Sequence, residues 1–391
     1  MRLPVAFYDR VQAELVARIA EQDLDGLLVT TPGDIAYLAG FFYAVTERPV
    51  YLWIGADGDR FCLIPQLDEE YASAQDIQAD VVTYFEYPGV VAPEANLAAE
   101  LQRRGHAGAR IGFSPALSTG ALATLREVLP GADWTSTSTV GWMRRTKHPE
   151  EIEFHRKAGA ICDEMLAAGR SLIEDALWGG KPLPSEGSLA RHVISHGTEL
   201  MHDRFDHVVY TTKLAGGLVY AGPNSARPHG LPSSRRLAIG DTLILSLGAA
   251  VASRFVESER TFVIGEPTTE QEAYFSVALA AQEVGVQGMT LGRTCAEVNA
   301  ESLDVIRDAG MGEYIQHRLG HGIGIAQHEA PWIDDGDSSL LEAGMVLSSE
   351  PGIYVPGHGG YRISDTVLTT AHGPERLTRY PRTLEQNVIP A

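Results

Sequence analysis

The hydrophobic and polar positions in the first third of the chain switch between two periods. Val11, Leu15 and Ile19 recur four residues apart with charged residues between them, which predicts an amphipathic helix over residues 7–22. Short apolar runs that suit buried strands follow at residues 27–31, 50–54 and 110–113, and a turn is predicted at residues 32–34. Strands separated by helical patterns are typical of an α/β domain, which we expect to cover residues 1–146.

Residues 147–391 are expected to form a second domain, because the pattern restarts there with a helix. Pro149 suits the first helical position and the acidic residues after it suit the helix dipole, so we predict a helix that continues to about Arg170. Thr269 and Glu272 fit a capping box that begins another helix. A further helix is predicted over residues 296–309, and strands over residues 242–247, 261–264 and 345–349. The second domain is therefore α+β or α/β.

The composition narrows the range of partners. The chain has 391 residues, 44% of them hydrophobic, and its 51 acidic against 31 basic residues give a formal charge of −20. A surface this acidic repels nucleic acids and anionic membranes, so we expect neither as a partner. Cys62, Cys162 and Cys295 lie too far apart in sequence for a disulfide framework or a spaced thiolate metal site. With no apolar run of about 18 residues and no signal peptide, a soluble cytoplasmic protein is expected.

Histidines and carboxylates gather late in the chain, inside segments with the pattern of strands. Solvated charges are unexpected in such segments, so these residues mark a candidate site. The segments are residues 222–229, 256–261, 320–329, 349–354 and 359–365. Glu257 and Glu259 are two positions apart, which places both side chains on the same face of a strand.

In this order and spacing, the five segments resemble those of the pita-bread family, which includes methionine aminopeptidases, Xaa-Pro peptidases, creatinase and ectoine hydrolase. The resemblance covers residues 150–391, and the preceding part is similar to the N-terminal domain of the Xaa-Pro peptidase and creatinase branch. It implies an α/β N-terminal domain followed by an α+β pita-bread domain, in which pseudo-twofold halves surround a curved antiparallel sheet. It also implies a homodimer.

The peptidases of that family hold two divalent metals with two Asp, one His and two Glu. The matching positions in this chain are Ser246, Glu257, His321, Glu350 and Ser364. Two ligands are lost and one is lengthened, and serine hydroxyls are poor ligands for the hard divalent ions that prefer carboxylates. We therefore expect no two-metal site. A single divalent ion (Mn, Zn or Co) on Glu257, His321 and Glu350 is left open, because three protein ligands and water form a viable catalytic site.

The alternative is acid–base catalysis without metal, for which creatinase is the precedent in the family. Creatinase uses a His at the position of His229 and carboxylates at those of Glu259 and Glu350, and all three residues are present here. The resemblance implies that His229 moves a proton, that the carboxylates orient substrate and water, and that His321 or His328 stabilises the tetrahedral centre. Without a metal such a cavity is negative, which favours a substrate with an amidinium, guanidinium or amine group.

Two arginines are candidate substrate-binding residues. Arg48 lies at the same distance from Gly40 as the creatinase Arg that grips the substrate carboxylate from the neighbouring subunit. Arg362 is the second candidate, and an ion pair with Glu350 is an equally open role for it. Gly216-Gly217 lacks the spacing and the Lys of a P-loop, so nucleotide binding is excluded.

Together these observations predict a hydrolase that cleaves a C–N bond, of amidine or amide type, in a small zwitterionic substrate. The nearest alternative is an Xaa-Pro dipeptidase or aminopeptidase that uses at most one divalent metal ion. A third interpretation is a noncatalytic pita-bread binding protein, against which the retained His and Glu positions argue.

Overall fold

The computed structural model describes residues 2–391, which divide into two units. One unit contains residues 2–144 together with residues 209–211. The other contains residues 145–208 and 212–391. No helix within residues 2–391 combines the length and the apolar character needed to cross a membrane.

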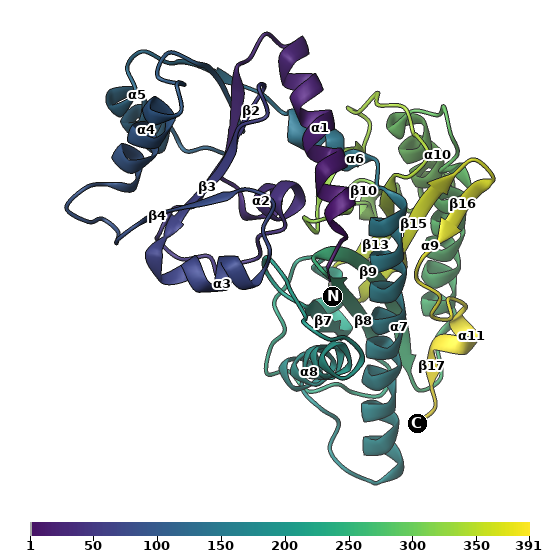
Figure 1. The fold of residues 1–391 in the computed structure, drawn as a ribbon. Coiled ribbons are helices and arrows are strands. Elements are labelled where there is room, and N and C mark those ends of the chain that lie inside the picture. Colours follow the sequence, from purple (N-terminus) through teal and green to yellow (C-terminus); the bar gives the residue numbers. More distant parts are fainter. Residues whose placement is uncertain (1) are drawn as a thin grey trace. The chain divides into compact units, whose positions relative to one another are not determined.

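The N-terminal unit is built on a six-stranded sheet with the strand order β4-β3-β2-β1-β5-β6 (Figure 1). Its strands are β1 (Gly26–Val29), β2 (Tyr51–Gly55), β3 (Arg60–Pro65), β4 (Asp80–Tyr84), β5 (Arg110–Phe113) and β6 (Asp133–Ser136). Its helices are α1 (Val5–Glu21), α2 (Pro32–Ala39), α3 (Glu69–Ala74), α4 (Pro93–Arg103), α5 (Thr119–Val128) and α6 (Thr139–Arg145). Helices α4 and α5 pack on the sheet around the buried side chains of Leu28 and Trp53.

The predicted turn at residues 32–34 is wrong, because these residues open helix α2. Thr31 is its N-cap, and the backbone N–H of Asp34 donates to the Thr31 hydroxyl over 3.4 Å. Pro32 occupies the first turn, where its missing N–H costs nothing and its fixed φ favours the helix. Proline followed by glycine is common to turns and to helix starts, so this pattern does not separate the two.

The C-terminal unit combines long helices with one large sheet. Its helices are α7 (Pro149–Trp178), α8 (Glu186–Arg204), α9 (Thr269–Gly288), α10 (Cys295–Asp308) and α11 (Leu384–Asn387). Its strands are β7 (Ala215–Ala221), β8 (Thr242–Val251), β9 (Arg254–Ile264), β10 (Gly320–Gly322), β11 (Glu329–Ile333), β12 (Val346–Ser349), β13 (Gly352–Val355), β14 (Gly359–Arg362), β15 (Ser364–Thr370), β16 (Gly373–Arg376) and β17 (Val388–Ile389). Helix α7 is eight residues longer than the pattern predicted.

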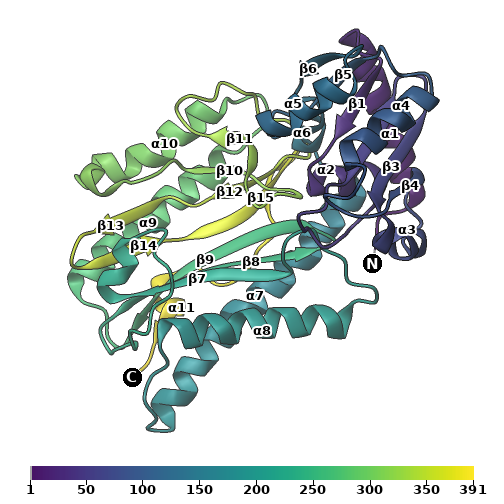
Figure 2. The same ribbon diagram turned by 90° about the vertical axis from the view of Figure 1, so that its left-hand side faces the viewer.

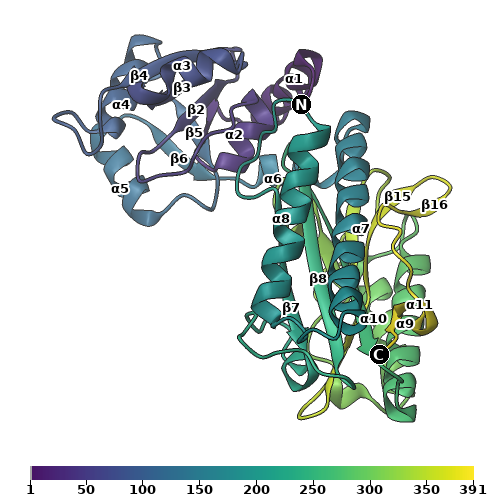
Figure 3. The same ribbon diagram turned by 90° about the horizontal axis from the view of Figure 1, so that it is seen from below.

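The large sheet has nine strands, in the order β11-β10-β12-β15-β9-β8-β7 with β16 and β17 attached to β15 and β9. Strands β13 and β14 form a separate pair. Figure 2 shows α7 and α8 along one side of β7, β8 and β9, and Figure 3 shows these two helices running beside β8. Leu245 of β8 points toward α7, where its Cδ1 lies 2.8 Å from the place of a Cβ on Gly169. Because side chains alternate along a strand, the neighbouring Ser246 faces away from α7.

Helix α9 begins at Thr269 as predicted, but its capping box lies one residue earlier than expected. Thr268 is the N-cap, and the box is formed by Thr268 and Gln271 rather than by Thr269 and Glu272. The Gln271 N–H donates to the Thr268 hydroxyl over 3.2 Å, and the Thr268 N–H donates to the Gln271 side chain over 2.9 Å. Both residue pairs fit the capping pattern in sequence, so only the structure separates them.

The β8–β9 hairpin decides which acidic side chains share a face. Its two-residue turn, Ala252 and Ser253, has φ values of 47° and 59°, and positive φ at both positions is typical of a type I′ turn. The resulting register pairs Ser246 with Glu259. A slip by one residue would move every side chain to the opposite face, so this turn directs Glu257 and Glu259 away from α7.

Candidate functional site

A cavity of about 310 Å³ lies in the C-terminal unit, on the face of the sheet opposite α7. Strands β7, β8 and β9 supply part of its wall, and the segments that follow β10 and β12 supply another part. The residues that line it are Lys213, Gly217, Leu218, Tyr220, His229, Ser246, Leu247, Glu257, Glu259, Gln327, His328, Glu350 and Arg362. Segments that are far apart in sequence therefore meet around one small space.

His321 lies between two carboxylates that line the cavity. Its Nε2 is 3.2 Å from Oε1 of Glu350 and 3.6 Å from Oε2 of Glu257. The His321 backbone N–H donates to the hydroxyl of Ser348 over 3.0 Å, which ties β10 to β12. Gly320 allows this close approach, since a Cβ there would stand 2.1 Å from the carbonyl oxygen of Ser348.

The charges of this cluster are strongly coupled. Burial and the charge of Glu350 raise the pKa of Glu257 to about 8. Burial also favours neutral Glu350, but its contact with His321 outweighs this and lowers the pKa of Glu350 to about 2. Burial lowers the pKa of His321, whereas the two carboxylates raise it, with a net value of about 9. The cluster therefore holds protons that a bound cation would displace.

Glu259 pairs with Arg362 on the same face of the sheet. Nε of Arg362 lies 2.5 Å from Oε2 of Glu259, and Ser246 donates a hydrogen bond to Oε1 of the same carboxylate. Burial raises the pKa of Glu259, while the charge of Arg362 acts in the opposite direction. The suggested ion pair between Arg362 and Glu350 is not formed, because Glu350 contacts His321 instead.

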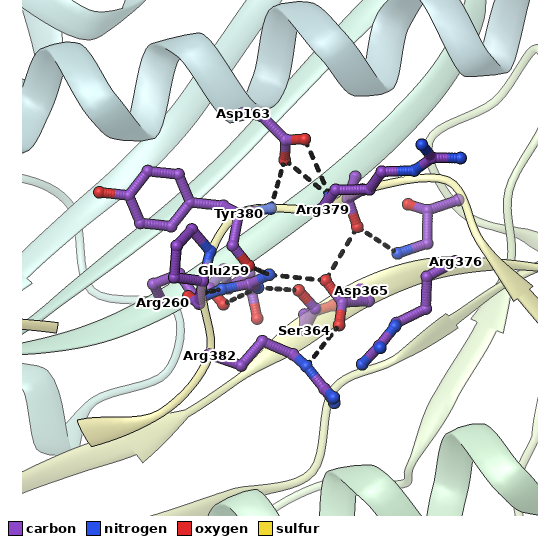
Figure 4. A network of polar contacts seen from close by, with 12 residues as sticks. Asp163, Glu259, Arg260, Ser364, Asp365, Arg376, Arg379, Tyr380 and Arg382 are labelled. Carbon is purple, nitrogen blue, oxygen red and sulfur yellow. Dashed lines mark hydrogen bonds and ion pairs between the residues drawn. The ribbon is translucent and has the colours of Figure 1, made fainter. Parts of the chain in front are cut away.

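A second buried ion pair fixes strand β15 beside β9, next to the cavity (Figure 4). Nη2 of Arg260 lies 2.7 Å from Oδ1 of Asp365, and both side chains are fully buried. The same guanidinium donates to the backbone carbonyls of Glu259 and Ser364 over 2.8 and 2.7 Å. This network places the Ser364 hydroxyl 3.2 Å from Oε1 of Glu257, to which it donates.

Two further histidines of the sequence analysis reach the site. His229 lines the cavity after strand β7, and its exposed ring is free to meet a substrate. His328 also lines the cavity, with its ring centroid 3.9 Å from that of His321. Burial and the charge of His321 lower the pKa of His328 to about 4, so its imidazole is neutral near pH 7.

Arg48 belongs to the N-terminal unit. Its Nε lies 2.7 Å from Oε1 of Glu86, and its Nη1 lies 2.6 Å from Oε1 of Glu47. Its role in substrate binding stays a prediction.

Three polar lining residues were missed by the sequence analysis. Tyr220 donates to the backbone carbonyl of Pro228 over 2.7 Å, which orients the residue before His229. Lys213 precedes strand β7, and Gln327 precedes His328 in the chain. Lys213 could have been found from the sequence, because it is a basic residue shortly before Gly216-Gly217. No comparable sequence pattern surrounds Gln327.

The donor set fits one divalent cation. Metal sites with nitrogen and oxygen donors have bonds of about 2.0–2.2 Å, so donors separated by 3.2 and 3.6 Å can share one ion. His321 has this separation from Glu350 and from Glu257, each taken as a pair. The three residues whose donor atoms all lie within 4.8 Å of one another are Glu257, His321 and His328.

The donor set does not fit a second cation. At the two other family ligand positions, Ser246 donates to Glu259 and Ser364 donates to Glu257. Their hydroxyls thus support carboxylates, and a hydroxyl brings no charge to balance a second divalent ion.

Comparisons with known families agree with this arrangement. Residues 10–146 match the Creatinase/Prolidase N-terminal domain, and residues 153–371 match Metallopeptidase family M24. The chain belongs to family M24. The predicted fold, an α/β N-terminal domain followed by an α+β pita-bread domain with a curved antiparallel sheet, is confirmed.

Relatives of this M24 chain include peptidases and dipeptidases. An uncharacterized peptidase of Staphylococcus aureus is 28% identical over 95% of this chain and 99% of its own length. The structure of an Xaa-Pro dipeptidase from Bacillus anthracis has a TM-score of 0.84 and 27% identity, over 96% of this chain and 99% of its own. The dipeptidase PepE from Mycobacterium ulcerans has a TM-score of 0.84 and 29% identity, with both chains covered completely.

Proposed function

We propose that this chain is a hydrolase that cleaves the C–N bond of a dipeptide-sized substrate, in the manner of an Xaa-Pro dipeptidase, with one divalent metal ion. The observation that carries the proposal is His321 at 3.2 and 3.6 Å from Glu350 and Glu257, two carboxylates that line a small cavity. A volume of about 310 Å³ is at the lower end of ligand pockets, which suits a dipeptide better than a longer peptide. The dipeptidases among the structural relatives support the same substrate class.

In this proposal Glu257, His321 and Glu350 hold the ion, which supplies Lewis-acid polarisation and a more acidic water. His229 lines the same cavity and carries a proton to the leaving nitrogen. The neutral ring of His328 donates an N–H to the oxygen that becomes negative in the tetrahedral intermediate. Glu259, held by Arg362, orients the ammonium group of the substrate.

A second candidate is hydrolysis without metal, as in creatinase. The observation that favours it is that Ser246 and Arg362 both contact the Glu259 carboxylate and hold it in place. Glu259 lines the same cavity as His229, so the two side chains could perform acid–base catalysis without a metal. In this candidate Glu259 and Glu350 orient the substrate cation and the water, and His321 stabilises the tetrahedral centre.

Metal analysis of the purified protein, with hydrolysis of alanyl-proline and creatine in the presence and absence of a chelator, tests both candidates. One ion per chain and chelator-sensitive cleavage of alanyl-proline are expected. Cleavage that resists the chelator in metal-free protein contradicts the proposal and favours the second candidate. If alanyl-proline and creatine bind but neither is hydrolysed, both candidate functions are contradicted and the interpretation as a noncatalytic binding protein is favoured.

A further inference from the structure

Two glycines and an acidic residue form one row across three neighbouring strands. Gly216 of β7 pairs with Gly248 of β8, and Gly248 pairs with Glu257 of β9. Residues directly opposite each other in antiparallel strands point to the same face of the sheet. The row therefore lies on the face that carries Glu257, and its two glycines have no side chain to cover the strands.

Two polar side chains from other segments approach the strands at these glycines. A Cβ on Gly216 would have the Lys213 side chain as its nearest neighbour, with Nζ at 2.9 Å. A Cβ on Gly248 would have Nε2 of Gln327 at 3.9 Å. Lys213 and Gln327 both line the cavity, and each places a nitrogen over one of two adjacent strands.

Lys213 and Gln327 have no partner for their nitrogen donors, whereas Arg362 and His321 each contact a carboxylate. Arg362 pairs with Glu259, and His321 contacts Glu350. Within residues 2–391, the Lys213 ammonium is in no ion pair and the Gln327 side chain makes no hydrogen bond. Partial burial lowers the pKa of Lys213, although the residue stays exposed enough for a ligand to reach its ammonium. A bound anion would supply the missing counter-charge.

The spacing suits one amino-acid residue. Neighbouring strands are about 4.8 Å apart, so Gly216 of β7, beside the Lys213 nitrogen, lies about 10 Å from Glu257 of β9. One residue spans about 3.5 Å, and a polar contact of about 3 Å at each end extends its reach to about 10 Å. A substrate whose scissile carbonyl lies at Glu257 would thus bring the carboxylate of its next residue to Lys213 and Gln327.

We infer that Lys213 and Gln327 bind the free carboxylate of the substrate and restrict this enzyme to short substrates that end one residue after the scissile bond. The inference rests on the proposed function, and it names two residues of this chain that would select the substrate class. Gly216 is part of the same site, because a Cβ there would stand 2.9 Å from the Lys213 nitrogen. An ammonium and an amide can hold the two oxygens of one carboxylate.

The test compares a carboxylate with its uncharged amide in the full chain. Values of kcat/KM are measured for alanyl-proline and alanyl-prolinamide, and binding of N-acetylproline and N-acetylprolinamide is measured by calorimetry. The wild type should prefer each acid over its amide by about 10- to 100-fold, the range of a charge-assisted hydrogen bond. Lys213→Met should lose this preference mainly through KM, and Gln327→Leu should lose part of it. Lys181→Met, which removes an exposed ammonium, is the matched control and should leave the preference unchanged.

Gly216→Ala provides a second variant that keeps the charge. Its Cβ would displace Lys213, whose atoms are the three nearest neighbours of that position, so the preference should fall although the ammonium is retained. Equal use of acid and amide by the wild type overturns the inference, as does a preference that survives Lys213→Met or a lack of binding by both acetylated probes. Hydrolysis without acid preference would leave the proposed function standing. Acid-selective binding without any hydrolysis would leave the carboxylate site standing and reject the proposed function.

Discussion

Ser364 donates a hydrogen bond of 3.2 Å to Glu257, so a residue at one family ligand position supports the carboxylate at another. Ser246 does the same for Glu259. Each serine lowers the negative charge of the cavity by one relative to the acidic ligand of the family and satisfies a buried carboxylate oxygen. At the two positions where the family resemblance places acidic metal ligands, this chain thus has hydroxyls that fix the two glutamates.

Restoring the acidic ligands should restore the second ion. We expect the variant Ser246→Asp with Ser364→Glu and Glu259→Thr to bind two divalent ions per chain, because it recovers the two missing carboxylates and removes one that would compete with them. Elemental analysis after dialysis against Mn²⁺ measures the stoichiometry. Ser364→Glu alone is the matched control, with one ion expected. A triple variant that still binds a single ion would show that more than these positions limits the site.

His229 should control turnover rather than folding. We expect His229→Ala to lower kcat by about 10²- to 10⁴-fold, the contribution of a positioned general acid or base. The ring is exposed and, within residues 2–391, makes no hydrogen bond or ion pair, so the unfolding midpoint in urea should stay unchanged. His372→Ala, at another exposed histidine, should affect neither quantity. Undiminished turnover of His229→Ala would reject its catalytic role.

The Arg260–Asp365 pair should be a major source of stability for the C-terminal unit. Arg260→Met leaves Asp365 buried without its counter-ion, and we expect it to lower the free energy of unfolding by about 3–5 kcal/mol. Urea denaturation followed by circular dichroism measures this loss. Arg379→Met, at an exposed neighbour in Figure 4, is the control. A loss for Arg260→Met no larger than the about 0.5 kcal/mol of ordinary surface substitutions would contradict the assignment.

His155 should make stability depend on pH below neutrality. Burial and the charge of Lys147 lower its pKa to about 3, while Nδ1 lies 2.6 Å from the Phe255 carbonyl. An unfolded chain titrates this group near about 6.5, so between these values the unfolded state binds more protons. The free energy of unfolding contributed by His155 is therefore constant above about pH 6.5 and falls toward pH 3, by up to about 1.4 kcal/mol per pH unit.

The variant His155→Phe isolates this contribution. It should be less stable than the wild type near neutral pH, because the Phe255 carbonyl loses its partner, yet its stability should change less with pH. Urea unfolding at several values between about pH 7 and pH 5 measures both slopes. His372→Gln should retain the slope of the wild type. Parallel slopes for His155→Phe and the wild type would contradict the prediction.

Much of the fold follows from local patterns in the sequence. The strand at residues 110–113 was predicted with its observed bounds, because an isolated run of apolar residues between helices has few alternatives. Helix α7 was predicted from Pro149 and its acidic first turn, and its last eight residues were missed since no strong stop precedes Gly179. Thr31 was not recognised as an N-cap, because the Pro-Gly-Asp that follows it also fits a turn.

The sequence by itself determined the chemistry that is available at the family positions. Residue type alone states that Ser246 and Ser364 cannot balance a second divalent ion, wherever they lie in space. Tertiary structure decided the partners. Arg362 meets Glu259 rather than Glu350, and Lys213 and Gln327 line the same cavity. These pairs join strands and loops distant in sequence, and their register depends on the Ala252–Ser253 turn, whose positive φ values no local pattern announced.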